Sequence, residues 1–342
     1  MNKSESWNRR YASIGLKKRI INAYTRYIES IDTEKYPIIF EFNHLSKLMG
    51  MTPKYLASVI NSTEDHYRNF SIPKRNKKGL REIQAPYPAL LECQKWINRN
   101  ILSNIPIHSA AHGYVSKKSI KTNAEEHLAQ KSLLKIDLKN FFPSININRI
   151  MNVFQRCGYA DNVSFYLARI CCYDNRLPQG AATSPYLSNV IAFTLDKRLH
   201  NMAKKLNLNY TRYADDLSFS GDKITWKAVD YISRIVEDCG FEINTNKTLL
   251  ISGHNKKIVT GLSVSGDQVK IPKKYKRKLR QELHFIMSYG YLSHISNRKI
   301  RNPFYLDSIH GKYTFWKSIE PDNKFIQKYD SRLAEVIDYL RS

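Results

Sequence analysis

Three aspartates occupy positions from which carboxylates could act together on metal ions. Asp137 lies near the end of a short apolar run, Leu133–Leu138, and Asp215 and Asp216 lie within the alternating segment Tyr210–Ser220. The first pattern is typical of a buried strand, and the second predicts two strands joined by a turn. A strand end and a hairpin turn can bring these carboxylates to one place.

Nucleotidyl transfer is the chemistry that such carboxylates support. When a 3′-hydroxyl attacks an α-phosphate and expels pyrophosphate, negative charge builds on the attacking and the leaving oxygen. Two Mg²⁺ ions about 3.5–4 Å apart can stabilise both charges, and Mg²⁺ prefers a few carboxylates together with substrate phosphates. We therefore expect Asp137, Asp215 and Asp216 to hold two Mg²⁺ ions, for which Mn²⁺ could substitute. The backbone carbonyl near Leu138 would be a further oxygen ligand.

The adjacency of Asp215 and Asp216 leaves an alternative open. Neighbouring side chains of a regular strand point to opposite faces, so both reach one site only if the turn interrupts the alternation. On this ground Asp215 ranks above Asp216 as a direct ligand. An isolated Asp-Asp pair is also common in β-turns, so the metal hypothesis depends on the surrounding motifs.

The composition favours a polyanionic partner. The 342 residues contain 55 Lys and Arg against 30 Asp and Glu, a formal net charge of +25. Such a charge attracts nucleic acid, although a basic soluble protein or one at a membrane surface could also carry it. The five cysteines show no zinc-site spacing, and no apolar stretch approaches the roughly 18 residues of a membrane span. These features predict a reduced, cytoplasmic protein without a membrane partner.

The pattern of apolar residues divides the chain into three parts. Residues 1–70 are predicted to be helical, residues 71–265 mix strands and helices, and residues 266–342 begin with a basic amphipathic helix. We expect a β-hairpin between 72 and 88 with cations at its tip. A further helix should begin within 122–127, with an Asn or Thr cap.

Three motifs follow one another in the order and spacing of the palm motifs of reverse transcriptases. They are Ile136-Asp137-Leu138-Lys139-Asn140-Phe141-Phe142, Leu177-Pro178-Gln179-Gly180 with Ser184-Pro185, and Tyr213-Ala214-Asp215-Asp216. The chain therefore resembles this family over residues 70–300 or so. The resemblance implies an α+β right-hand polymerase. Fingers and a palm of antiparallel sheet and helices would span 71–265, and a helical thumb with an RNA-recognition region would span 266–342.

Two further motifs resemble signatures of the retron branch of that family. Asn123-Ala124-Glu125-Glu126-His127 matches N-A-x-x-H, and Val259-Thr260-Gly261 matches V-T-G. Alone, each has a simpler interpretation: Asn123 could cap a helix, His127 could be a partly buried histidine, and Gly261 could allow a close backbone approach. Because both occur in the expected order around a complete palm, the chain is identified as a member of the retron branch.

Residues that resemble the family's nucleotide-binding positions fall into three kinds. Cations would hold phosphates, an aromatic ring would leave no room for a 2′-hydroxyl, and a turn would lie against nucleotide and template. The cations are Lys78 and Arg81 at the triphosphate and Lys247 near the leaving pyrophosphate; the ring is Phe142, and the turn is Gln179-Gly180. A solvated charge, a core aromatic ring and an ordinary turn are the structural alternatives.

A basic helix and the two signatures would hold the nucleic acid. A heteroduplex of any sequence must be gripped through its backbone, so phosphate contacts suit the task. The resemblance implies that the region after V-T-G recognises an RNA hairpin, for which aromatic residues near the C-terminus are suited. The RNA-binding candidates are Asn123, His127, Val259, Thr260, Gly261, Lys273, Lys274, Arg277, Lys278 and Arg280.

The retron branch implies a set of partners. The enzyme would use a structured noncoding RNA of the msr-msd type as template. It would prime from the 2′-hydroxyl of an internal guanosine in the same RNA, and so make RNA-linked single-stranded DNA from dNTPs. Antiphage defence would involve a separate effector protein, and a host ribonuclease H would remove the template.

Three other functions stay open at this point. An intron-encoded or diversity-generating reverse transcriptase would share the palm motifs. The helices between residues 43 and 60 could form a helix-turn-helix DNA reader. A noncatalytic RNA-binding protein could retain a polymerase shell. The retron signatures argue against the first alternative, and the complete set of aspartates argues against the last.

Overall fold

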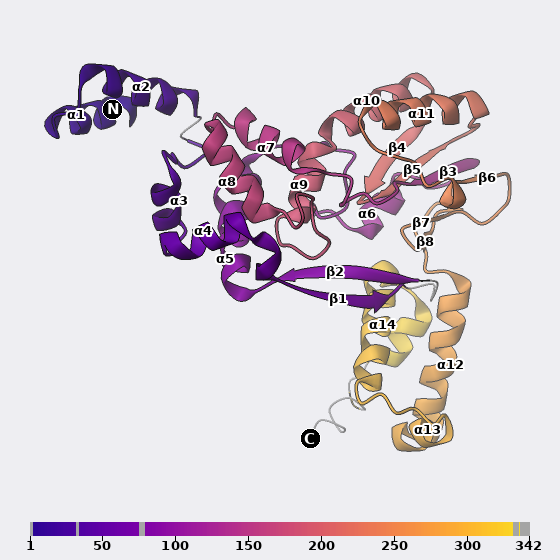
Figure 1. Ribbon diagram of the computed structural model, residues 1–342. Coiled ribbons are helices and arrows are strands. Elements are labelled where there is room, and N and C mark those ends of the chain that lie inside the picture. The colour runs from indigo at the N-terminus through magenta and orange to yellow at the C-terminus, as the bar shows by residue number, and fades with distance from the viewer. Residues whose placement is uncertain (1–2, 32–33, 75–78, 331–334, 336–342) are drawn as a thin grey trace.

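The structure, a computed structural model, describes residues 3–31, 34–74, 79–330 and 335. A helical arm lies at the N-terminus, a central body contains the main sheet, and a column of helices extends from the body toward the C-terminus (Figure 1). Among the described residues, no helix has both the length and the apolar composition needed to cross a membrane.

Helices form most of the N-terminal part, as predicted. They are α1 (Lys3–Ser13), α2 (Lys18–Ser30), α3 (Phe42–Leu48) and α4 (Pro53–Asn61). α1 and α2 pack on one another as the arm (Figure 1). The start of α4 is encoded locally, because Thr52 Oγ1 accepts a hydrogen bond from the Tyr55 amide at 3.3 Å and Pro53 occupies the first turn.

A two-stranded antiparallel ribbon follows the helices. β1 (Tyr67–Pro73) pairs with β2 (Leu80–Pro86), and the ribbon projects from the body (Figure 1). β1 begins earlier than the predicted hairpin because Tyr67 is a buried anchor, and its hydroxyl accepts a hydrogen bond from Gln94 Nε2 at 2.8 Å. The predicted phosphate ligand Lys78 is outside the described residues.

The main sheet contains four antiparallel strands in the order β4-β5-β3-β6. They are β3 (Ser132–Asp137), β4 (Asn209–Tyr213), β5 (Asp216–Gly221) and β6 (Leu249–Ser252). β3 is buried on both faces: Leu134 and Ile136 pack into the main core, whereas Leu133 packs into a second core. Burial on both faces explains why this strand is a continuous apolar run rather than an alternating one.

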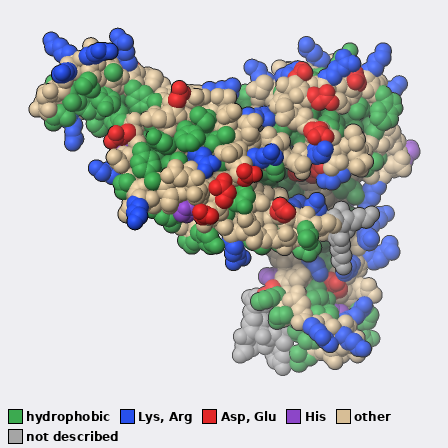
Figure 2. Space-filling view, in the orientation of Figure 1, with side chains coloured by type: hydrophobic (Ala, Val, Ile, Leu, Met, Phe, Trp, Pro, Cys, Tyr) green, Lys and Arg blue, Asp and Glu red, His purple; other side chains and the backbone are tan. Residues whose placement is uncertain are grey.

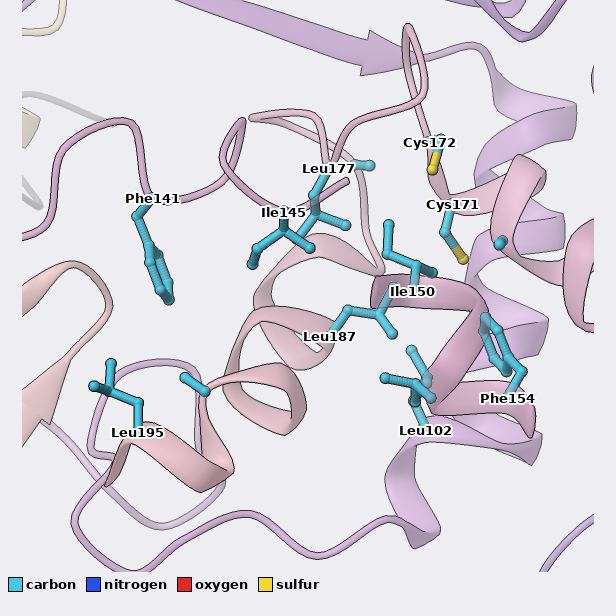
Figure 3. Close-up of a cluster of buried hydrophobic side chains, with 14 of the residues drawn as sticks. Leu102, Phe141, Ile145, Ile150, Phe154, Cys171, Cys172, Leu177, Leu187 and Leu195 are labelled. Carbon is cyan, nitrogen blue, oxygen red and sulfur yellow. The ribbon is translucent and has the colours of Figure 1, made fainter. Parts of the chain in front are cut away.

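Helices of the body cover the sheet. They are α5 (Pro88–Asn100), α6 (Ile120–Glu125), α7 (Ile147–Arg156), α8 (Asp161–Cys171), α9 (Ser184–Ile191), α10 (Phe193–Lys205) and α11 (Trp226–Asp238). All of them except α6 contribute to the main core. Leu102, Ile150, Phe154 and Leu187 come from distant segments and meet in this core (Figure 3). All five cysteines are free thiols.

The second core joins the body to the helical column. The column contains α12 (Lys273–Tyr289), α13 (Tyr291–Asn297) and α14 (Tyr305–Ile319), and the short strands β7 (Ile258–Val259) and β8 (Leu262–Ser263) precede it. Leu279, Leu283 and Ile286 form the buried stripe of α12 and share this core with Trp316 of α14. The predicted basic amphipathic helix is therefore confirmed.

The segment that carries Asn123 begins earlier than predicted. Its cap is Ser119, whose side chain accepts hydrogen bonds from the amides of Lys121 and Thr122, each at 3.2 Å. Thr122 Oγ1 accepts in return from the Ser119 amide at 2.9 Å, which completes a capping box. The prediction of an Asn or Thr cap was wrong because this reciprocal pair competes better for the helix start.

His127 is fully buried beneath the sheet. Its Nδ1 lies 2.7 Å from Ser220 Oγ on β5, and its Nε2 lies 2.7 Å from Thr211 Oγ1 on β4. Burial lowers the pKa of His127 to about 3, and the nearby His112 acts in the same direction. The neutral ring therefore connects two strands of the main sheet.

We predict that His127 makes the stability of the fold depend on pH. An unfolded histidine titrates near pH 6.5, so below that pH the unfolded chain binds a proton that the folded chain excludes. The free energy of unfolding should fall by up to about 1.4 kcal/mol per pH unit as the pH drops from 6.5 toward 4. Urea unfolding of the wild type and His127→Gln at several pH values measures this term.

The His127→Gln variant should show a shallower decline in this range even if it is less stable at neutral pH. The matched control is His254→Gln, which removes an exposed histidine and should leave the slope of the wild type unchanged. Equal slopes for wild type and His127→Gln would contradict the assignment of a buried neutral ring.

Candidate active site

The register of the main sheet brings two of the predicted aspartates together. Asp137 is the last residue of β3 and lies directly opposite Asp216, the first residue of β5. Cross-strand partners in an antiparallel pair project from the same face of the sheet. Asp216 therefore lies beside Asp137 on the same face, although strand alternation had ranked it below Asp215 as a direct ligand.

Asp215 joins them from the turn between β4 and β5. The turn consists of Ala214 and Asp215, and Ala214 has a φ of +55°, in the left-handed region that tight hairpin turns use. The Asp215 carbonyl accepts a hydrogen bond from the Leu138 amide at 2.8 Å, which ties the turn to the end of β3. Side chains alternate between faces only within a regular strand. Because Asp215 lies in the turn, this alternation does not direct its side chain away from that of Asp216.

The carboxylates influence one another's ionisation. Burial and the charges of Asp216 and Asp137 raise the pKa of Asp215 to about 6. Burial also raises the pKa of Asp216, with a further contribution from Asp137 that Lys135 and Lys247 oppose. Nearby negative charges in a partly buried cleft disfavour the ionised form of a carboxyl group. A cation bound at this edge of the sheet would offset that repulsion.

Two side chains hold the Asp137 carboxylate. Lys247 Nζ lies 2.8 and 2.9 Å from its two oxygens, and Asn244 Nδ2 donates to one of them at 3.0 Å. The backbone N–H of Asn244 also donates to the backbone carbonyl of Asp137 at 2.8 Å. Lys247 thus reaches the site, as predicted, with Asp137 as its partner in this structure.

The donor set suits a hard divalent cation. Asp137, Asp215 and Asp216 offer oxygen ligands alone, which is the chemistry that Mg²⁺ and Mn²⁺ prefer. In the part of the chain that is described, no three His, Cys, Asp or Glu side chains are already arranged as a metal-ligand set. Since Lys247 pairs with Asp137, a cation would compete with this ion pair for the carboxylate.

A cleft of about 570 Å³ opens beside the aspartates. Its lining includes Arg81 and Gln84 of β2, Tyr114, Phe142, Gln179, Asn244 and Lys247. The predicted nucleotide-binding residues Arg81, Phe142, Gln179 and Lys247 therefore share one cavity with the aspartates. Gly180 does not line this cavity.

Gly180 instead allows the turn to pack against the ribbon. Its φ is +135°, and a Cβ at this position would lie 2.5 Å from the Gln84 carbonyl oxygen. The Gln84 amide donates to the Gln179 carbonyl at 2.9 Å, and the Gln179 amide donates to Gln84 Oε1 at 3.2 Å. Glycine at 180 thus fixes β2 beside the cleft, while a contact with nucleotide or template stays a prediction.

A buried ion pair beneath the hairpin had no recognisable sequence signal. Arg212 of β4 and Asp196 of α10 are both fully buried. Arg212 Nε and Nη2 donate to the two Asp196 oxygens at 2.8 and 2.6 Å, and the Tyr210 hydroxyl donates to Asp196 Oδ1 at 2.8 Å. Arg212 Nη1 also donates to the Ala214 carbonyl at 3.1 Å. The pair therefore anchors the turn that carries Asp215.

Two further residues that the sequence analysis missed shape the site. A Cβ on Gly113 would lie 2.6 Å from the Ala214 amide nitrogen, so a larger residue would displace the turn. Tyr114 lines the cleft with a φ of +61°. Burial and the Asp215 charge raise the pKa of Tyr114, and Arg81 opposes them. These positions are recognised only once the fold has brought residues 113–114 to the hairpin.

Comparisons with known proteins agree on one family. The family model described as reverse transcriptase (RNA-dependent DNA polymerase) matches residues 66–282. Retron Ec86 reverse transcriptase of Escherichia coli is 35% identical over 253 residues, which span 73% of this chain and 79% of that protein. The chain belongs to the retron reverse transcriptases. It is an RNA-directed DNA polymerase with the right-hand fold of that family.

Two further comparisons cover more of the chain. Retron Ec73 reverse transcriptase of Escherichia coli is 32% identical over 314 residues, which span 85% of this retron reverse transcriptase and 94% of that protein. A solved foamy viral protease-reverse transcriptase in complex with double-stranded DNA has a TM-score of 0.46 and 14% identity, over 99% of this chain and 56% of that chain.

The retron signatures meet where the body of this reverse transcriptase joins the helical column. Asn123 is buried, and its Nδ2 lies 3.5 Å from Thr260 Oγ1, whose hydroxyl donates to the Ile120 carbonyl at 2.9 Å. Val259 and His127 are fully buried. The signatures therefore form a structural junction, and a direct RNA contact by His127 or Val259 is incompatible with this conformation.

The other RNA-binding candidates lie at the surface. Lys273, Lys274, Arg277 and Lys278 are exposed on α12, and Gly261 is exposed between β7 and β8. Arg280 is exposed too, but its guanidinium lies over the rings of Trp316 and Phe325, at 5.3 and 5.0 Å from the centroids. Arg280 therefore also has a packing role in the column.

We predict that the buried pair of Asp196 and Arg212 is essential for the stability of this reverse transcriptase. Asp196→Ala leaves an uncompensated guanidinium in the core, which should lower the free energy of unfolding by about 3–5 kcal/mol. Replacing both residues, in Asp196→Ala with Arg212→Met, should cost less than the sum of the single changes. Urea unfolding measures the four states of this cycle.

The matched control is the exposed ion pair of Arg198 and Asp238, whose side chains retain 42% and 59% exposure. Asp238→Ala should change the free energy of unfolding by less than about 1 kcal/mol. Similar small losses for Asp196→Ala and Asp238→Ala would show that the buried pair does not anchor the hairpin.

Proposed function

We propose that this retron reverse transcriptase copies part of a structured noncoding RNA into single-stranded DNA, starting from the 2′-hydroxyl of an internal guanosine in that RNA. The observation that carries the proposal is the cleft in which three aspartates face a fingers-like ribbon with a cation, Arg81. The identity to retron enzymes over most of the chain supports the retron product, an RNA-linked DNA.

We propose the same division of the right-hand fold into parts that the sequence predicts. The helices of residues 1–70 precede the enzyme core, the ribbon and the main sheet would be fingers and palm within 71–265, and the helical column would be the thumb and RNA-recognition region within 266–342. Because β1 begins at Tyr67, the ribbon would start a few residues before the proposed boundary at residue 71.

Asp137, Asp215 and Asp216 would hold two Mg²⁺ ions together with the Leu138 carbonyl, and Mn²⁺ could substitute. When bound, such ions stabilise the negative charge on the attacking and leaving oxygens. The protein's own contribution is to keep the three carboxylates on one edge through the β3–β5 register and the Leu138–Asp215 hydrogen bond.

Cations on both sides of the cleft would hold the nucleotide. Arg81 has no ion pair with any other described residue, so its guanidinium can donate paired hydrogen bonds to the oxygens of a triphosphate. Lys247 would neutralise the leaving pyrophosphate after exchanging its contact with Asp137 for a phosphate. Gln179 lines the same cleft and would lie against the base or the template.

Phe142 would select deoxynucleotides by excluding the 2′-hydroxyl. Its ring is half-buried in the cleft, between Phe141 at 5.6 Å and Tyr114 at 6.3 Å between centroids. We predict that Phe142→Val raises the ratio of ribonucleotide to deoxynucleotide incorporation by about tenfold or more. Primer extension with each nucleotide type measures this ratio.

Phe141→Val is the matched control, because Phe141 is buried in the main core against Phe241. This variant should lose stability without a change in sugar selectivity. An unchanged incorporation ratio in Phe142→Val, or an equal rise in Phe141→Val, would assign Phe142 to packing alone.

The thumb would grip the RNA–DNA heteroduplex through its phosphates. The exposed cations of α12 support this role, because a polymerase must bind every sequence that it copies. Beyond them, the column exposes Tyr289 to 65% and Phe304 to 70%, and such aromatic rings can stack on unpaired bases. The column would thus recognise the structured RNA of msr-msd type.

The biological role would be antiphage defence. A separate effector protein would be controlled by the RNA–DNA product, and a host ribonuclease H would remove the copied template in the cytoplasm. Membership of the retron family supports this role. The effector protein and the ribonuclease would bind the noncoding RNA, the RNA–DNA product or the reverse transcriptase itself.

We predict that expression with the native flanking noncoding locus yields a discrete DNA species that shortens slightly after ribonuclease treatment. Asp215→Asn should abolish it, because the site loses one of the charges that a divalent cation requires. Denaturing gels of extracted nucleic acid measure the product. Asp222→Asn, an exposed aspartate just after β5, is the matched control and should leave the product unchanged.

Two outcomes would redirect the proposal. DNA that lacks an attached RNA would favour an intron-encoded or diversity-generating type of reverse transcriptase. Absence of DNA from the wild type, although the RNA is present and bound, would favour a noncatalytic RNA-binding protein, unless primer extension on a supplied template succeeds.

A further inference from the structure

The N-terminal arm carries a groove that the polymerase reaction does not use. The groove has a volume of about 720 Å³, within the range of sites that bind a small ligand. It is lined by Lys17, Arg19, Ile20, Ala23, Tyr24 and Tyr27 from the arm, by Phe40, and by Ala160 and Asn162 at the start of α8. The arm and the body therefore enclose it together.

An aromatic cluster holds one ring of the groove in place. The Tyr24 ring stacks on Tyr11 and meets Phe40 edge-on, each with centroids 5.2 Å apart. Tyr11 is buried, whereas Tyr24 remains 37% exposed. A ring that is fixed on one side and open on the other is a preformed surface for stacking with a nucleobase.

The surface around the groove is strongly basic. From Trp7 to Ile31 the chain contains six Lys and Arg residues and one acidic residue, Glu29. All six cations are exposed, and none forms an ion pair with another described residue. In Figure 2 the arm shows hydrophobic side chains gathered on one face, with Lys and Arg side chains around them.

This combination favours one kind of occupant. An apolar helix from a partner protein would cover the groove but would leave the cations without counter-charges. A nucleic-acid strand offers bases to Tyr24 and phosphates to Lys17 and Arg19 at the same time. Asn162 adds a side-chain amide to the lining, which can hydrogen-bond a 2′-hydroxyl.

We propose that the groove between α2 and the start of α8 binds single-stranded RNA at a site separate from the polymerase cleft. The site would hold a single-stranded stretch of RNA while another part of the molecule is copied. It depends on the stacking ring and the cations of the arm, and it does not depend on how DNA synthesis is primed or on a role in defence.

Photocrosslinking of the full chain to a short unstructured RNA containing 5-iodouridine tests the site directly. Mass spectrometry should locate crosslinks at Tyr24, Tyr27 or Phe40. Tyr24→Leu keeps an apolar side chain but removes the ring, and should lower the crosslink yield in the groove about fivefold or more. Tyr231→Leu removes an exposed ring of α11 and is the matched control, with no loss expected.

The charge of the arm is tested by salt dependence. Lys17→Glu with Arg19→Glu should reduce the slope of log affinity against log salt by about 1–2, because two phosphate contacts are lost. The same change at the exposed pair Lys223 and Lys227 is the control and should not alter crosslinking in the groove. Melting temperatures of all variants show whether each one is folded.

Crosslinks confined to the polymerase cleft or α12 would overturn the proposal, as would equal losses for Tyr24→Leu and Tyr231→Leu in folded proteins. Equal crosslinking of single-stranded DNA with 5-iododeoxyuridine would overturn the assignment to RNA. Because the probe is unrelated to the noncoding RNA, failure of this site would leave the proposed priming reaction unaffected.

Discussion

The mutual repulsion of Asp137, Asp215 and Asp216 has to be overcome before these three carboxylates can share one edge of the main sheet. Backbone contacts do so: the cross-strand pairing of Asp137 with Asp216, and the hydrogen bond from the Leu138 amide to the Asp215 carbonyl. Neither contact involves the carboxylates themselves. The side chains are thereby kept together without using the oxygens that a divalent cation would need, apart from those of Asp137 that Lys247 and Asn244 contact.

The palm was predictable because its signals are local. A strand that is buried on both faces is a continuous apolar run, which made β3 recognisable from a short segment. The β4–β5 unit was recognisable because its two-residue turn lies within a motif of the family. The rank of Asp216 below Asp215 depended on strand alternation alone. That argument fails because the cross-strand register, which sequence order does not reveal, places Asp216 opposite Asp137.

The roles of several motif residues were not predictable because they depend on segments far apart in the chain. Asn123 and Thr260 meet across 137 positions, and His127 lies between two strands that follow it by more than eighty positions. Gly180 looked like a contact for nucleic acid, whereas the atom that excludes a side chain there is the carbonyl of Gln84. The motifs therefore identified the family correctly, but they did not predict which groups each motif residue contacts.

The two retron signatures differ in what they can contribute physically. His127 is hydrogen-bonded through both ring nitrogens at 2.7 Å and links β4 to β5, the two strands joined by the turn that holds Asp215. The Asn123–Thr260 contact is long at 3.5 Å, and Asn123 Oδ1 has no partner among the described residues. A weak polar contact of this kind adds little stability. The contact instead marks where the helical column joins the body, at the place where α6 packs against β7 and β8.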